Sequence, residues 1–155
     1  MSNPQPKCCE IQSCTIEFRV RYAEVDRQNA VHHSQYAIYF EMGRTELLRI
    51  NNYDYKTLED TGSLLVVARL DTQFKYPAQY DDEMILLTEI DETTRFKLIH
   101  KYTLRRKSDR KIIATGTTTL VHVDTVGKMQ QLPPFLYLKK SWVSTFGMSP
   151  LPPYL

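Results

Sequence analysis

The chain has 155 residues, of which 42% are hydrophobic and 25% charged, with 20 basic and 18 acidic side chains. This length and composition are typical of one globular domain and argue against a disordered or fibrous protein. The formal net charge of +2 is too small for a dedicated nucleic-acid binder, so we expect no nucleic-acid partner.

The first eleven residues are predicted to form a polar tail. Cys8, Cys9 and Cys14 are odd in number and crowded together, which argues against a disulfide framework, and no Cys or His pair follows at zinc-like spacing. No apolar run reaches the about 18 residues that span a bilayer, and the first ten residues lack the apolar centre of a signal peptide. We therefore expect a cytoplasmic protein with reduced thiols, no bound metal and no membrane span.

A strand is predicted over residues 14–22, because apolar side chains alternate there with polar ones: Ile16, Phe18, Val20 and Tyr22. A long helix follows, with one apolar stripe at helical spacing: Tyr36, Tyr39, Phe40, Gly43, Leu47 and Ile50. Ser34 is a candidate N-cap, and Asn51-Asn52 is a natural stop. A glycine within a helix costs about 1 kcal/mol relative to alanine, so Gly43 predicts close approach to a sheet.

The remainder of the domain is predicted to be a short helical turn at residues 55–60 and then four strands. Strands over residues 64–76, 84–90, 96–106 and 111–123 are rich in β-branched residues and separated by turns at Asp81-Asp82, Asp91-Glu92 and Ser108-Asp109. Short turns favour antiparallel pairing, so the class is α+β. Prolines gather after Leu132; we therefore place the domain at residues 12–132, the tail at 1–11 and an extension at 133–155.

The stretch from Arg21 to Arg49 resembles hotdog-fold acyl-CoA thioesterases of the 4-hydroxybenzoyl-CoA thioesterase and YbgC-like family. That family's motif runs Asp, two variable residues, Gly, one variable residue, Val, then a His or aromatic position. Here the sequence DRQNAVHHSQY places four residues on the motif: Asp26, Val31, His33 and Tyr36. Asn29 stands where the family has glycine, and asparagine tolerates the positive φ that the glycine is expected to provide.

The resemblance extends over about residues 15–123. It includes the ExxRTE segment that begins at Glu41 and the segment FKYPAQYDDEM. It implies a hotdog fold, in which an antiparallel sheet of about five strands wraps one long helix. It also implies a homodimer or homotetramer with active sites at the subunit interface.

The resemblance further implies the roles of individual residues. Asp26 is expected to attack the thioester or to activate water as a general base. The backbone amide of His33, at the helix N-terminus, is expected to polarise the thioester oxygen, and its imidazole is a further candidate contact. Val31 and Tyr36 are expected to bind substrate. Relatives place a catalytic acid on this helix, so Glu41 is a second candidate, although an ordinary helix-surface pair with Arg44 or Thr45 is a strong alternative.

The expected reaction is hydrolysis of acyl-CoA to a free acid and CoA, with no cofactor beyond the substrate. The GxSxG, P-loop, GxGxxG and HExxH motifs are absent from the sequence. Two alternatives remain: an acyl-carrier-protein thioesterase, and a non-catalytic acyl-CoA-binding module, against which Asp26 argues. Six basic residues on the predicted strands are candidates for CoA phosphates, although such charges usually face solvent: Arg69, Lys75, Arg95, Lys97, Arg105 and Arg106.

Overall fold

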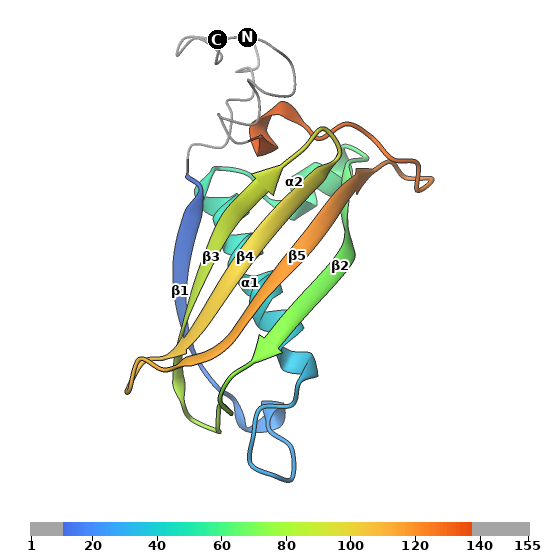
Figure 1. Ribbon diagram of the computed structural model, residues 1–155. Coiled ribbons are helices and arrows are strands. Elements are labelled where there is room, and N and C mark those ends of the chain that lie inside the picture. Colours follow the sequence, from blue (N-terminus) through green and yellow to red (C-terminus); the bar gives the residue numbers. More distant parts are fainter. Residues whose placement is uncertain (1–10, 138–155) are drawn as a thin grey trace.

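The computed structural model describes residues 11–137, and the remainder of the predicted tail and of the extension lies outside the described residues. The elements in chain order are β1 (Ser13–Arg19), the 3₁₀ helix η1 (Tyr22–Glu24), α1 (Ser34–Ile50), α2 (Tyr55–Asp60), β2 (Leu64–Phe74), β3 (Glu83–Thr93), β4 (Lys97–Arg106), β5 (Ile112–Val123) and the 3₁₀ helix η2 (Pro134–Leu136). The strands form one antiparallel sheet in the order β1-β3-β4-β5-β2, and α1 lies along one of its faces (Figure 1). The predicted α+β arrangement of one long helix and five strands is confirmed.

β1 buries most of the face that the alternation predicts. Ile16, Phe18 and Val20 pack into the core beside α1. The strand ends at Arg19, however, and Tyr22 lies in η1 with 78% of its surface exposed, so its predicted burial is wrong. The Glu24 carboxylate accepts a hydrogen bond from the Arg21 amide at 2.8 Å, which turns the chain out of the sheet before Tyr22.

α1 begins one residue earlier than the predicted cap implies. His33 is the N-cap and Ser34 is the first helical residue, because the Ser34 hydroxyl bonds Nδ1 of His32 at 2.8 Å and caps no backbone amide of the helix. The assignment of Ser34 as N-cap is therefore wrong. The helix ends at Ile50, followed by Asn52 at a φ of 66°, so the predicted stop is confirmed.

The third strand continues through a predicted turn. Asp91 and Glu92 lie inside β3, where the register with β4 shifts between Ile90 and Glu92. A bulge absorbs the extra residue, so the ladder runs on to Thr93. The chain reverses only afterwards, and the Thr94 amide donates to the Lys97 carbonyl at 2.8 Å. The predicted turn at 91–92 is wrong, whereas those at 81–82 and 108–109 lie between strands as expected.

The core has two parts along α1. Tyr39, Phe40 and Tyr102 belong to the part nearer the N-terminal end of the helix. The other part lies at the C-terminal end and includes Leu136 and Tyr137, from the start of the predicted extension. Residues 133–137 therefore pack at the end of α1 remote from the segment that carries Asp26 (Figure 1). Within the described part of the chain, no helix is both long and apolar enough to cross a membrane.

Candidate active site

Four of the five predicted site residues line one pocket of about 330 Å³ at the N-terminal end of α1. They are Asp26, Val31, His33 and Tyr36. Its other walls are Ala30 and a segment at the end of β2: Phe74, Lys75, Tyr76 and Pro77. Of this second wall, sequence reasoning named only Lys75, as a candidate for CoA phosphates. The segment FKYPAQYDDEM matched the family pattern, but its periodicity does not reveal which loop it meets.

The loop that carries Asp26 is a small closed hairpin. The Asp26 amide donates to the Ala30 carbonyl at 2.9 Å, and Val25 and Val31 form an isolated antiparallel bridge. The exposed Asp26 carboxylate accepts hydrogen bonds through Oδ1 from the amides of Gln28 at 2.8 Å and Ala30 at 3.4 Å. These bonds orient the carboxylate, because two amides of the same loop hold one of its oxygens.

Asn29 forms the tip of this hairpin with positive φ. Its φ is 58°, and its amide donates to the Asp26 carbonyl at 3.0 Å. Asparagine adopts this left-handed region more readily than most residues that carry a Cβ. The expected tolerance of Asn29 for positive φ is confirmed.

The hairpin is anchored beneath by Glu24, which sequence reasoning did not single out. Its buried carboxylate accepts hydrogen bonds from Tyr39 Oη at 2.9 Å and from the Arg21 guanidinium at 2.8 Å. Burial raises the pKa of Glu24, but the hydrogen bonds from Arg21 and Tyr39 outweigh burial and hold that pKa below its usual value. The Glu24 carbonyl also accepts from the His32 amide at 2.9 Å, so an ionised Glu24 ties the base of the loop to α1.

The N-terminal end of α1 borders the pocket at His33. His33 is the N-cap, and its amide makes no hydrogen bond within residues 11–137. The Ser34 amide donates to Nδ1 of His32 at 3.3 Å. Free amides at a helix start concentrate partial positive charge, so an oxygen that gains negative charge is stabilised there.

The apolar side of the pocket is aromatic. Tyr36 is 3% exposed, and its ring meets that of Phe74 edge to face with centroids 4.9 Å apart. Burial raises the pKa of Tyr36, so its hydroxyl stays protonated. The Val31 amide donates to the Ala78 carbonyl at 2.8 Å, which joins the two walls directly.

Glu41, the fifth predicted site residue, is not brought into this pocket. Its exposed carboxylate accepts a hydrogen bond from Nη2 of the buried Arg44 at 2.9 Å. The surface pair that the sequence left open is therefore the one observed. Of the six basic residues considered for CoA phosphates, Lys75 alone lines the pocket.

A second cavity lies between the C-terminal half of α1 and the sheet. Arg44, Leu47 and His100 are among the residues that line it, and it holds only about 20 Å³. This volume suffices for about one water molecule, so we assign no substrate to it. No group of three or more His, Cys, Asp or Glu side chains that could hold a metal ion occurs among residues 11–137.

Comparison with known proteins identifies the family. Residues 20–140 match the thioesterase-like superfamily. This match covers more than half of the sequence, so the chain belongs to the thioesterase-like superfamily.

Curated relatives include the acyl-CoA thioesterase YbgC of Haemophilus influenzae, which is 31% identical over 113 residues, or 72% of this chain and 81% of YbgC. YneP of Bacillus subtilis (strain 168) is 33% identical over 86 residues, or 56% of this chain and 62% of YneP. A protein of Aquifex aeolicus (strain VF5) is 36% identical over 84 residues, or 54% of this chain and 66% of that protein. The matches to YneP and to the Aquifex protein thus span just under two thirds of those relatives.

Solved structures show the same fold. The DHNA-CoA thioesterase from Staphylococcus aureus matches with a TM-score of 0.75 and 24% identity, over 77% of this chain and 80% of that one. A hypothetical protein from Aquifex aeolicus matches with a TM-score of 0.73 and 30% identity, over 77% of this chain and 93% of that one. The predicted hotdog fold is confirmed.

Proposed function

We propose that this chain hydrolyses acyl-CoA thioesters to a free carboxylic acid and CoA. The observation that carries the proposal is that the Asp26 carboxylate and the N-terminal end of α1 line one pocket of about 330 Å³. Thioester hydrolysis requires a group that attacks or activates water, and a positive pole for the carbonyl oxygen. The name of the Haemophilus relative, an acyl-CoA thioesterase, supports the same reaction.

Asp26 is proposed as nucleophile or as general base. As nucleophile, a carboxylate oxygen bonds to the thioester carbon and expels CoA as thiolate, and water then hydrolyses the mixed anhydride. As general base, the carboxylate takes a proton from a water that attacks the same carbon. The bonds from the Gln28 and Ala30 amides to Oδ1 support either role, because they orient the carboxylate before substrate arrives.

The amide of His33 is proposed to bind the thioester oxygen as that oxygen gains charge. Such a donor is worth about 3 kcal/mol of barrier, and a backbone donor survives replacement of its side chain. Tyr36 and Val31 are proposed to contact the acyl group, because both line the pocket from the α1 side. Glu41 lies outside the pocket of its own chain, so any catalytic role for it requires a neighbouring subunit.

A second copy of the chain is proposed to pair along β2. This 11-residue strand is the last in the sheet order, and its exposed apolar side chains include Val66, Val67, Leu70 and Phe74. An unpaired edge with apolar side chains favours association, which would cover both. Phe74 belongs to the edge strand and to the pocket wall, so pairing would bring the partner close to the site in a homodimer or in a tetramer of dimers.

The test is thiol release from a panel of aliphatic and aromatic acyl-CoA esters, with Asp26→Asn compared with wild type. Asparagine keeps a side-chain oxygen for the loop amides but removes the anionic oxygen, so we expect kcat to fall by about 10²–10⁴-fold. Asp60→Asn is the matched control, because Asp60 is exposed at the end of α2, at a distance in sequence from every pocket residue.

Each other outcome has its own meaning. Turnover of carrier-bound acyl groups alone would favour the acyl-carrier-protein thioesterase. Saturable acyl-CoA binding without turnover would favour a binding module. Full activity of Asp26→Asn would contradict the role assigned to Asp26.

A further inference from the structure

The pocket wall formed by Lys75, Tyr76 and Pro77 lies beyond the end of β2 and has no regular structure of its own. The amides of Lys75 and Tyr76 donate to the same acceptor, the carbonyl of Ile113, at 2.8 and 3.2 Å. Pro77 has no amide hydrogen to offer. These two bonds tie Lys75 and Tyr76 to β5, whereas the position of Pro77 depends on contacts from other parts of the chain.

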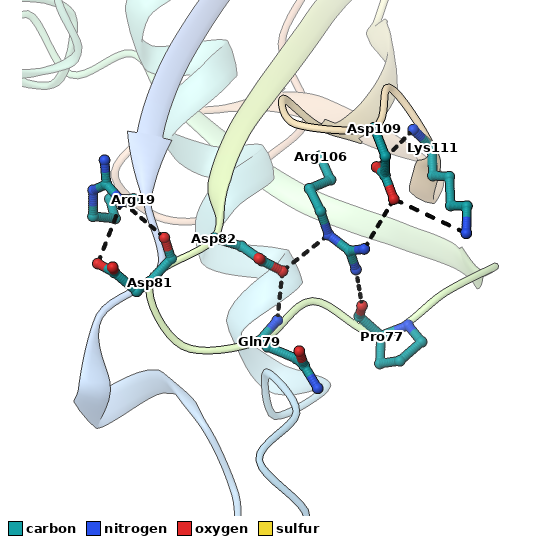
Figure 2. Close-up of polar contacts among 8 residues, drawn as sticks. All are labelled: Arg19, Pro77, Gln79, Asp81, Asp82, Arg106, Asp109 and Lys111. Atoms are coloured by element: carbon teal, nitrogen blue, oxygen red, sulfur yellow. Dashed lines mark hydrogen bonds and ion pairs between the residues drawn. The ribbon is translucent and has the colours of Figure 1, made fainter.

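Arg106, the last residue of β4, makes one such contact to Pro77 and two more to neighbouring connections (Figure 2). Nη2 donates to the Pro77 carbonyl at 2.6 Å, Nε to Asp82 Oδ2 at 3.0 Å and Nη1 to Asp109 Oδ2 at 3.1 Å. The side chain is only 20% exposed. One guanidinium thus connects the pocket wall with the residue before β3 and with the β4–β5 turn.

Two neighbouring groups extend the same network. Asp82 Oδ2 also accepts from the Gln79 amide at 2.9 Å, which fixes the loop just after Pro77. Lys111 Nζ lies 5.1 Å from the ring centroid of Tyr76 and 4.0 Å from Asp109 Oδ2. Arg106 therefore holds Pro77 through its carbonyl, and Lys111 contacts Tyr76 through its ring. Figure 2 shows how Pro77, Arg106, Asp109 and Lys111 are linked.

We propose that Arg106 is a positioning residue for acyl selectivity, which holds the Tyr76–Pro77 wall at its distance from Asp26 and so sets the space open to the acyl group. Arg106 does not line the pocket and acts only through the wall. The planar fork of arginine reaches three acceptors in fixed geometry, whereas lysine offers one compact ammonium. The kinetic part of this proposal rests on the proposed thioesterase function; the structural part does not.

The test compares Arg106→Lys with Arg19→Lys. Arg19 contacts the same β2–β3 connection through the Asp81 carbonyl at 2.9 Å (Figure 2). It also bonds Oε1 of Glu83, the first residue of β3, at 2.6 Å, and neither acceptor belongs to the pocket lining. Both substitutions keep the charge and remove a fork, so they are chemically matched. The first readout is hydrogen exchange of the peptide that covers residues 75–79 in the resting protein. The second is the ratio of kcat/KM for benzoyl-CoA to kcat/KM for octanoyl-CoA.

We expect exchange of the 75–79 peptide to quicken by about tenfold in Arg106→Lys and to stay unchanged in Arg19→Lys. The benzoyl-to-octanoyl ratio is expected to shift by about tenfold in Arg106→Lys alone. A general loss of stability would scale both substrates together and leave the ratio unchanged. If hydrogen exchange is unchanged in Arg106→Lys, Arg106 does not anchor the wall. If exchange quickens but the benzoyl-to-octanoyl ratio stays unchanged, Arg106 does not set acyl selectivity.

Two further arms keep the outcomes separate. If wild type releases no thiol from any ester, the proposed function fails, and the exchange measurement still decides whether Arg106 holds the wall. If Arg106→Lys does not fold, Lys111→Gln takes its place, because Lys111 is 53% exposed and contacts the Tyr76 ring. In Lys111→Gln, hydrogen exchange of the 75–79 peptide and the benzoyl-to-octanoyl ratio should shift in the same directions by smaller factors. If neither quantity shifts, the proposal is overturned.

Discussion

Gly43 of α1 lies so close to Thr88 of β3 that a side chain at position 43 would displace its neighbours. A Cβ on Gly43 would stand 2.1 Å from Oγ1 of Thr88 and 2.8 Å from Cδ2 of Leu86. We expect Gly43→Ala to lower the free energy of unfolding by about 1–3 kcal/mol through overpacking, despite the gain of about 1 kcal/mol in helix propensity. Urea unfolding of the purified variant measures this.

The control for Gly43→Ala is the double variant with Thr88→Ala. Oγ1 of Thr88 is buried and makes no hydrogen bond within the described residues, so its removal breaks no bond and opens the space that the new methyl group needs. The double variant should be more stable than Gly43→Ala alone. Equal unfolding midpoints for Gly43→Ala and wild type would contradict the close contact.

The conformation of Asn29 leads to a second prediction. Asn29→Gly should retain activity, whereas Asn29→Ala should lose about 1 kcal/mol of stability and part of its turnover, because alanine tolerates a φ of 58° poorly. Asn52→Ala is the matched control, since Asn52 has a φ of 66° beyond the other end of α1. That control should lose similar stability and keep its kcat. Thiol release and urea unfolding measure both properties, and equal kcat values for the two alanine variants would argue against a role for the loop in catalysis.

His100 should make the fold sensitive to mild acid. Burial, together with the charge of Arg44, lowers the pKa of His100 to about 3, while the unfolded chain has its ordinary value of about 6.5. The unfolded state therefore binds the proton first, so the stability due to neutral His100 is complete above about pH 6.5 and is lost as pH falls towards 3.

His100→Leu removes this titration. Wild type should lose about 2 kcal/mol more than the variant between pH 7 and pH 5, because each pH unit below the unfolded pKa costs about 1.4 kcal/mol. Urea unfolding at both pH values gives the difference. Parallel losses in the two proteins would mean that His100 binds its proton equally well in the folded state.

The exposed edge of β2 leads to a fourth prediction, for the assembly. Val67 and Leu70 are 47% and 46% exposed on this edge strand. We expect wild type to be a dimer or tetramer by light scattering and the double variant Val67→Lys/Leu70→Lys to be a monomer. Val126→Lys is the control, because Val126 is 85% exposed after β5. A monomeric wild type would refute pairing along this edge.

Local patterns account for the elements that the sequence predicted correctly. The apolar stripe of α1 has a period that only a helix buries, and β1 alternates as a half-buried strand does. The errors occur where a specific hydrogen-bond or strand partner, and not the period of the segment, decides the backbone. Glu24 turns Tyr22 out of the sheet, and pairing with β4 carries β3 through Asp91 and Glu92 as a bulge. The apolar period of a segment does not reveal that Glu24 turns the chain after β1, or that β4 pairs with the end of β3.

For the site, the sequence by itself determined the half that lies on one stretch of chain. Asp26, Asn29 and His33 are close in sequence, so their motif predicted a turn followed by a helix start, and the left-handed Asn29 agrees with it. Only the tertiary structure decided the other half. The wall of Tyr76 and Pro77 meets Asp26 because antiparallel pairing and the Arg106 network bring it there. Such contacts depend on packing across the sheet, which a local pattern of residues does not encode.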